Sequence, residues 1–244
     1  MDLASAGLRE QPFPTHGKPL SVLSYHSERE ALDILNDTYL NPTGICLLQG
    51  PALSGKSTLI RSFIDTLHED CAVALIDGKD LNTTLFLNGI LQQFGYNFES
   101  NSPNELLGLI RVFALQQTAS HEPPILIVEN AHEMKPSALR ALCELADLKT
   151  RSGSALKIVL VSDQSQAALI GAPSMESISR RLLHDFHLRP MQKRESKPYL
   201  YKKLLAAGSD QPDSIFPDEV CDALWTASGG WPGILDRLAL MALA

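Results

Sequence analysis

Residues Gly50 to Ser57 have the types and the spacing of a loop that binds phosphate groups. They read Gly-Pro-Ala-Leu-Ser-Gly-Lys-Ser and match the P-loop pattern G-x-x-x-x-G-K-[ST]. In such a loop, unpaired backbone N–H groups and the positive end of a helix dipole attract phosphate oxygens. Lys56 would reach the β and γ phosphates of a nucleotide, and the hydroxyl of Ser57 would bind Mg²⁺. The stretch therefore predicts nucleotide binding.

The segments on either side of this loop are those that a phosphate site requires. The apolar run at residues 44–48 predicts a buried strand, and apolar residues after the loop recur at helical spacing. A helix is therefore expected to begin at Lys56. A chance glycine turn is the alternative reading, and the strand that precedes the loop argues against it. The predicted nucleotide-binding residues are Gly50, Pro51, Ala52, Leu53, Ser54, Gly55, Lys56, Ser57 and Thr58.

Polar residues end three further apolar runs of strand length, at residues 72–76, 125–128 and 156–161. Helical patterns separate these runs, and such alternation predicts an α/β fold with a parallel sheet covered by helices on both faces. Ligands of such sheets gather beyond the carboxyl ends of the strands. The polar residues that we expect at this edge, together with the P-loop, are Glu129, Asn130, Ser162 and Asp163.

The carboxyl-terminal part of the chain changes character. A short last strand is predicted at residues 186–188, before Pro190, and three helical patterns follow. A glycine-rich break at residues 229–233 precedes the third pattern, so we expect a small helical bundle appended to the sheet. The predicted segments are an amino-terminal segment at 1–43, a P-loop core at 44–190 and a helical lid at 191–244.

The composition limits the classes of function. The formal net charge of −7 gives no general attraction to nucleic acid. The sequence has no apolar run near the roughly 18 residues of a membrane helix, and its amino terminus lacks the regions of a signal peptide. The four cysteines form no C-x-x-C pair and fit reduced core thiols. These features predict a cytoplasmic protein.

Basic residues gather in one stretch near the carboxyl terminus. Two readings are open, a contact with nucleic acid or the solvated face of a helix, and the second is the commoner case. The residues of this basic stretch are Lys193, Arg194, Lys197, Lys202 and Lys203. The seven histidines show no spacing typical of metal ligands.

Five short motifs occur in order along the chain. They are G-L-R-E-Q-P-F at residues 7–13, H-S-E-R-E-A-L at 26–32, I-V-E-N-A-H at 127–132, F-H-L-R-P-M at 186–191 and G-G-W-P-G-I-L at 229–235. In type and order they resemble the ExeA/GspA-type AAA+ ATPases of bacteria. The resemblance implies an AAA+ core with a helical lid, ATP and Mg²⁺, and an oligomer or protein partner in an envelope-associated complex. It also implies a cytoplasmic location with recruitment to the inner membrane.

Three positions depart from the pattern of that group. Glu129 stands at the place of the Mg²⁺-organising aspartate and is one methylene longer. Asn130 stands at the place of the water-activating carboxylate, and an amide can orient water but cannot take its proton. Gly233 replaces the sensor arginine of the lid. General-base catalysis contributes about 10²–10⁴-fold, so we expect a slow ATPase, unless Glu133 acts as the base rather than as a solvated charge.

Other residues near these motifs have two readings each. Arg180 and Arg181 precede the last strand, where related ATPases place an arginine that reaches a neighbouring subunit's nucleotide; the alternative is an ordinary surface pair. Arg237 could replace the missing sensor arginine. Ser162 and Asp163 fall where a polar side chain would orient the attacking water. Asp163 could instead help to hold Mg²⁺ or cap the following helix, and the cap is its favoured role.

Three functions are consistent with these observations. The first is a slow ATPase that serves an envelope- or secretion-related assembly. The second is a nucleotide-gated scaffold with vestigial hydrolysis, because the P-loop is intact while the hydrolytic positions have changed. The third is a transposition-type regulator similar to TniB or MuB, which bind DNA, and the acidic balance argues against it. The predicted catalytic residues are Lys56, Glu129, Asn130, Arg180 and Arg181, with Ser57 and Glu129 as the ligands of the metal.

Overall fold

The computed structural model of the chain describes residues 7–14, 25–97, 100–120, 122–163 and 175–243. The chain divides into two compact units. The first, which we call the sheet unit, consists of the described residues within 33–50 and 63–187 and contains every strand of the described residues. The second, the lid unit, consists of the described residues up to 32, residues 51–62 and the described residues from 188 onward.

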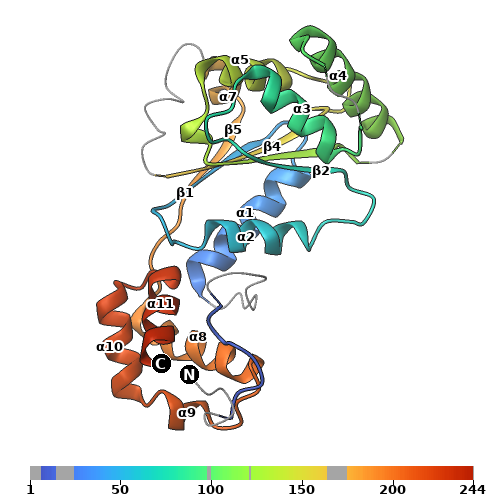
Figure 1. Cartoon of the computed structure of the whole chain (residues 1–244). Coiled ribbons are helices and arrows are strands. Elements are labelled where there is room, and N and C mark those ends of the chain that lie inside the picture. The colour runs from blue at the N-terminus through green and yellow to red at the C-terminus, as the bar shows by residue number, and fades with distance from the viewer. Residues whose placement is uncertain (1–6, 15–24, 98–99, 121, 164–174, 244) are drawn as a thin grey trace. The chain divides into compact units, whose positions relative to one another are not determined.

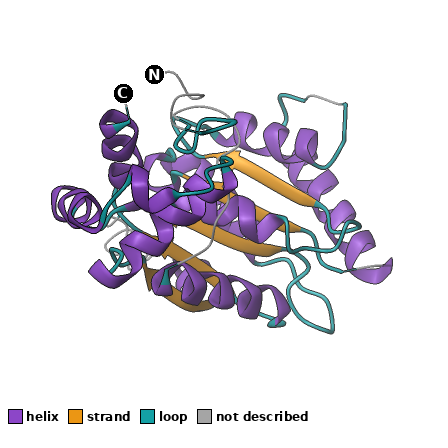
Figure 2. Cartoon of the chain, turned by 90° about the horizontal axis from the view of Figure 1, so that it is seen from below, coloured by secondary structure: helices purple, strands orange, loops and turns teal. Residues whose placement is uncertain are grey.

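Five parallel strands in the order β2-β3-β4-β1-β5 form the sheet. They are β1 (Ile45–Gln49), β2 (Val73–Asp77), β3 (Ile125–Glu129), β4 (Lys157–Ser162) and β5 (Leu182–His187). The central strands β3, β4 and β1 are buried almost throughout, because helices cover the faces of a parallel sheet. The strands run side by side in Figure 2. This arrangement confirms the predicted α/β fold.

The last strand starts earlier than the sequence predicts. β5 begins at Leu182 rather than at residue 186, and its residues alternate between half-buried and exposed. The reason is its place at the edge of the sheet, where one side of the strand faces solvent. Polar residues such as His184 and Asp185 therefore interrupt the apolar run on which the prediction depended.

On one side of the sheet in Figure 1 lie the helices of the sheet unit α3 (Thr83–Gln93), α4 (Pro103–Ser120), α5 (Pro136–Ala146) and the short α7 (Glu176–Ser179). α3 begins where the side chain of Asn82 accepts a hydrogen bond from Leu85 N at 3.0 Å. α4 and α5 each begin at a proline. Proline is common at the first helical position, because the backbone N–H that it lacks would have no intrahelical acceptor there. None of the described helices is both long and apolar enough to cross a membrane.

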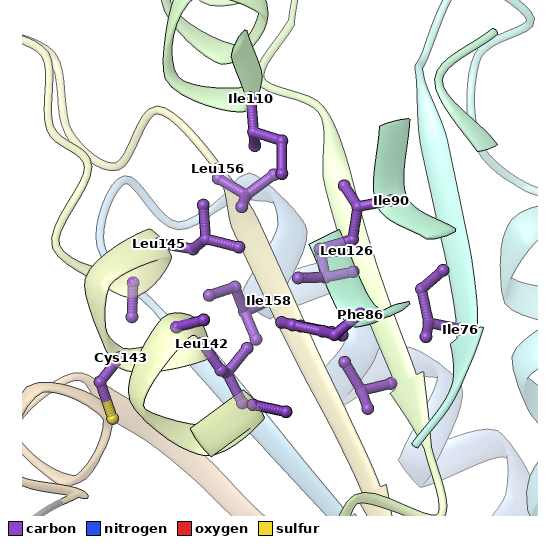
Figure 3. Packing of buried hydrophobic residues seen from close by; sticks show 14 of the residues in the cluster. Ile76, Phe86, Ile90, Ile110, Leu126, Leu142, Cys143, Leu145, Leu156 and Ile158 are labelled. Atoms are coloured by element: carbon purple, nitrogen blue, oxygen red, sulfur yellow. The ribbon is translucent and has the colours of Figure 1, made fainter. Parts of the chain in front are cut away.

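The side chains between these helices and the strands form one apolar core. Figure 3 shows Phe86 and Ile90 of α3 and Leu142 of α5 beside Leu126 and Ile158 of the sheet, and all five are fully buried. Each such side chain contributes about 1.5–3 kcal/mol through burial. The core therefore fixes the strands, and with them the residues at their carboxyl ends.

The lid unit has its own core, which includes the amino-terminal motif. Leu8 and Phe13 are buried in it, and the rings of Phe13 and Phe216 lie 6.2 Å apart. The backbone N–H of Arg9 donates to Ala207 O at 2.8 Å, which holds the motif against the end of a lid helix. The helices that lie in this unit, wholly or at their amino-terminal ends, are α1 (His26–Leu40), α2 (Lys56–Ile64), α8 (Lys193–Ala206), α9 (Pro212–Ile215), α10 (Asp218–Ser228) and α11 (Pro232–Ala242).

Two glycines make the break before α11. Gly229 ends α10 in the left-handed conformation. At Gly230 a Cβ would lie 2.4 Å from Met191 O, so only glycine fits there. Met191 N donates to Gly230 O at 2.8 Å, and Trp225 Nε1 donates to Met191 O at 2.8 Å. The glycine-rich motif thus lets the chain turn tightly against the start of the lid.

Candidate functional site

The P-loop begins where β1 ends. Gly50 N donates to Ser162 O at 3.2 Å, which ties the start of the loop to the carboxyl end of β4. Leu53 and Gly55 have positive φ angles of 63° and 93°, and these two left-handed residues give the loop its sharp turns. α2 then begins at Lys56, as the sequence predicts.

The first turn of α2 has backbone donors to offer a ligand. The first N–H groups of a helix have no intrahelical acceptor, and no backbone acceptor among the described residues takes those of Ser57 and Thr58. Ser57 is exposed, so its hydroxyl is accessible to a metal ion. Lys56 Nζ donates to Pro51 O at 2.8 Å, which places the ammonium group over its own loop. A polyphosphate with Mg²⁺ fits this set of donors.

Two carbonyl groups of the loop accept hydrogen bonds from residues elsewhere in the lid unit. The hydroxyl of Tyr25 donates to Ser54 O at 3.3 Å, and the backbone N–H of Gly233 in α11 donates to Leu53 O at 2.9 Å. Sequence reasoning did not name Tyr25, because a tyrosine before a helix carries no motif. It considered Gly233 only as a missing arginine.

At the carboxyl edge of the sheet, Glu129 is the last residue of β3 and Asp77 is its register partner on β2. Asn130 follows with a φ of 50°, a left-handed conformation that asparagine adopts more readily than most residues. Its Nδ2 donates to Asp77 Oδ1 at 2.9 Å. The amide at the position of the missing base is therefore held by a carboxylate from the neighbouring strand. Asp77 is absent from the predicted site, since the order of the strands is not visible in the sequence.

A small polar group lies beyond the ends of β3 and β4. His132 Nε2 is 3.4 Å from Asp163 Oδ2 and 3.7 Å from Glu133 Oε1. Glu133, which the sequence offers as an alternative base, therefore lies beside a histidine that the sequence does not predict as its neighbour. The hydroxyl of Ser162 is buried and has no hydrogen-bond partner among the described residues. The predicted cap from Asp163 to a following helix lies outside the described part of the chain.

Arg180 and Arg181 directly follow α7 and precede β5, as the sequence predicts. Arg180 pairs with Glu176 at 2.5 Å and its side chain is 75% exposed. Arg181 pairs with Asp147 at 2.7 Å, and its side chain is only 14% exposed. A contact with a second subunit needs an accessible guanidinium group, so Arg180 fits that role better than Arg181.

Ion pairs within the lid unit neutralise much of the basic stretch. The pairs are Lys193 with Asp222 at 2.9 Å, Lys197 with Asp218, and Lys203 with Asp236 at 2.5 Å. Lys203 is almost fully buried, so its ammonium group cannot reach a nucleic-acid backbone. Binding of nucleic acid needs accessible cations, and these pairs therefore favour the reading as a structural helix face.

The comparison with protein families decides how this loop and sheet are classified. The profile of the family described as AAA domain matches residues 40–178, more than half of the chain. The chain belongs to the AAA domain family. The matched range includes the P-loop, Asp77, Glu129 and Asn130.

A curated relative carries the resemblance further. The AAA domain protein described here is 28% identical over 240 residues to General secretion pathway protein A from Aeromonas hydrophila. The match covers 97% of the chain and 43% of that protein, so the chain spans less than half of the relative's length. This confirms the predicted resemblance to the ExeA/GspA-type AAA+ ATPases.

Solved structures share the fold at low sequence identity. Cdc6p from Pyrobaculum aerophilum superposes with a TM-score of 0.70 at 17% identity, over 94% of this chain and 62% of that one. The ORC2 protein from Aeropyrum pernix in its ADP form gives 0.71 at 16% identity, over 97% and 66%. The Thermotoga maritima RuvB Holliday junction branch migration motor gives 0.53 at 15%, over 94% and 64%. These matches establish the AAA fold and nothing finer.

Proposed function

We propose that the chain binds ATP with Mg²⁺ and hydrolyses it slowly. The observation that carries this proposal is the first turn of α2, where a P-loop ends in backbone N–H groups of Ser57 and Thr58 that have no backbone acceptor among the described residues. Such groups bind phosphate oxygens. The structure of ORC2 from Aeropyrum pernix in an ADP form supports a nucleotide as the ligand of this fold.

Each residue role follows from position and chemistry. Lys56 neutralises the β and γ phosphates, and the Ser57 hydroxyl contributes a ligand to the metal. Glu129, at the end of β3, provides the carboxylate for the metal. Mg²⁺, when bound, offsets the negative charge that develops on the phosphate oxygens.

Asn130 sets the expected rate. Its amide N–H donates to Asp77, which leaves the amide oxygen to accept a hydrogen bond from a water molecule. That oxygen can orient the water but cannot remove its proton. General-base catalysis contributes about 10²–10⁴-fold, so we expect turnover to be slower by about that factor than with a carboxylate at this position.

The biological setting is proposed from the curated relative. Its name, General secretion pathway protein A, supports a role in an envelope- or secretion-related assembly, as an oligomer or with a protein partner. In an oligomer, the exposed Arg180 would reach the nucleotide of a neighbouring subunit, and Arg181 would stay with Asp147. A cytoplasmic location with recruitment to the inner membrane through a partner completes the proposal.

The test measures ATP binding and single-turnover hydrolysis with Mg²⁺ on the wild type and on Lys56→Ala. We expect the variant to bind ATP at least about tenfold more weakly, because it loses a charge-assisted bond, and to hydrolyse it more slowly. Absence of ATP binding by the wild type would refute the proposal. Binding without turnover above that of Lys56→Ala would favour a nucleotide-gated scaffold, for which the amide of Asn130 is the specific observation.

A further inference from the structure

Tyr25 and Gly233, both in the lid unit and far from the P-loop in sequence, donate hydrogen bonds to carbonyl groups of the loop. Tyr25 directly precedes α1, and Gly233 lies in the first turn of α11. The Tyr25 hydroxyl donates to Ser54 O at 3.3 Å, and Gly233 N donates to Leu53 O at 2.9 Å. Two consecutive carbonyl groups of the loop therefore point toward Tyr25 and the start of α11.

The contact at Gly233 leaves no room for a side chain. A Cβ at this position would lie 2.8 Å from Leu53 O and 2.9 Å from Leu53 Cβ, closer than Cβ atoms come in real structures. The neighbouring Pro232 packs on the same loop, with its Cγ 3.3 Å from where a Cβ of Gly55 would be. The backbone at the start of α11 thus lies directly on the loop, and an arginine at position 233 could not keep this packing.

The contact at Tyr25 is a buried hydrogen bond. The residue is 1% exposed, and burial raises the pKa of its hydroxyl well above the ordinary value. The hydroxyl therefore stays protonated and remains a donor to Ser54 O throughout the physiological range. It also lies 3.6 Å from where a Cβ of Gly55 would be, an ordinary contact, so both Tyr25 and Pro232 lie beside that glycine.

We propose that Tyr25 and Gly233 are positioning residues that hold the carbonyl groups of Ser54 and Leu53. The N–H group of Gly55, opposite the Ser54 carbonyl in the same peptide, then faces the phosphates, while that of Ser54 closes the turn by donating to Pro51 O at 3.3 Å. Successive N–H groups that point to one side of a turn form a concave site for an anion. The inference rests on the nucleotide binding proposed above. The contact also connects α11 to the phosphates directly. A change in the conformation of the loop on phosphate binding would reach α11 through Leu53 and Gly233, without an arginine.

The first test measures affinity for ADP with Mg²⁺ by calorimetry. Tyr25→Phe removes only the hydroxyl and keeps the buried ring. The matched control is Tyr201→Phe, which removes a hydroxyl that donates to Phe216 O at 3.0 Å within the lid helices. We expect Tyr25→Phe to weaken ADP binding about fivefold, as the loss of one hydrogen bond does, and Tyr201→Phe to leave it unchanged.

A second pair of variants tests the close approach at Gly233. Gly233→Ala places one methyl group against Leu53 and should weaken ADP binding about tenfold, since overpacking displaces the backbone. Gly108→Ala adds the same methyl group in α4, where nothing lies within 4 Å, and should leave the affinity unchanged. Thermal unfolding without nucleotide shows whether each variant is folded.

Tryptophan fluorescence separates positioning from a general packing defect. Trp225 and Trp231 are the two tryptophans of the chain, and Trp231 is the residue before the first turn of α11. In a Trp225→Phe background, pyrophosphate with Mg²⁺, which has neither base nor ribose, should change the emission of Trp231. The additional change Gly233→Ala should abolish this response at saturating pyrophosphate.

The outcomes distinguish the two proposals. If the wild type binds neither ADP nor pyrophosphate, nucleotide binding fails and the inference fails with it. If the wild type binds both, and Tyr25→Phe and Gly233→Ala keep its affinity and the Trp231 response, only the positioning role is overturned. Should Gly233→Ala not fold, the affinity of Tyr25→Phe decides.

Discussion

Reversing the hydrogen bond between Asn130 and Asp77 tests whether the amide limits hydrolysis. In the wild type, Asn130 Nδ2 donates to Asp77 Oδ1 at 2.9 Å. Asn130→Glu alone would put two carboxylates side by side. Two unit charges 4 Å apart repel by about 1 kcal/mol in water and about 4 kcal/mol at an effective dielectric constant of 20. Because Asp77 is exposed and Asn130 half-buried, we expect a cost between these two values.

The double variant, Asp77→Asn with Asn130→Glu, removes this repulsion. It restores one amide donor and one carboxylate acceptor at the ends of the same pair of strands, with the amide now at the end of β2 and the carboxylate directly after β3. Single-turnover hydrolysis of ATP with Mg²⁺ should rise about 10²–10⁴-fold over the wild type, the usual contribution of a general base. Urea unfolding should show the double variant to be about 1–4 kcal/mol more stable than the single variant at pH 8.

Acidic pH should remove the difference in stability. Repulsion raises the pKa of one carboxyl group in the single variant, so its folded state binds a proton more tightly than its unfolded state does. The stability of the single variant is therefore highest at low pH, where the group is protonated, and it falls as pH rises through the raised pKa. A double variant that hydrolyses ATP no faster than the wild type would refute the reasoning on Asn130. Asn130→Gln, which has the length of glutamate without its charge, controls for the left-handed backbone.

Three further predictions concern stability and can be checked by urea unfolding. Lys203→Met should cost about 1–3 kcal/mol, because it leaves the half-buried Asp236, whose side chain is 27% exposed, without its cation; a change below about 0.5 kcal/mol would contradict this. Burial raises the pKa of the Asp236 carboxyl group in the folded protein. The protonated group therefore contributes to folding stability below its ordinary pKa of 3.8, and this contribution is lost as pH rises through the raised pKa. Asp236→Asn should lack this pH dependence. Gly153→Ala should cost several kcal/mol, since its φ is +142° and a Cβ would lie 2.3 Å from Pro42 O, whereas Gly108→Ala should not destabilise.

The features that could be predicted from the sequence depend on residues close together in the chain. The strand before the loop, the turn itself and the helix start at Lys56 occupy one short segment. The end of β3 at Glu129 was visible because a buried parallel strand is a continuous apolar run. The edge strand β5 lacked such a run, and its start was therefore misplaced.

The features that could not be predicted depend on contacts between distant segments. Asp77 reaches Asn130 only because β2 and β3 are neighbours, which the sequence order does not state. Tyr25 reaches Ser54 across 29 residues, and no motif marks this pair. Gly233 could be recognised as a departure from a family pattern, but only the packing explains why a side chain has no room there. The subunit contact of Arg180 and the three predicted segments remain predictions.

The composition of the lid unit has a consequence for the order in which the chain folds during synthesis. The sheet unit needs no residue beyond 187, whereas the lid unit joins residues 51–62 to helices that follow residue 188. Domains form from the amino terminus as the chain emerges, and contacts between remote segments form late. The strands can therefore pair while the Gly233 contact to Leu53 does not yet exist. A nascent chain would hold a complete sheet and a phosphate loop that lacks its contact with Gly233 until α11 has left the ribosome.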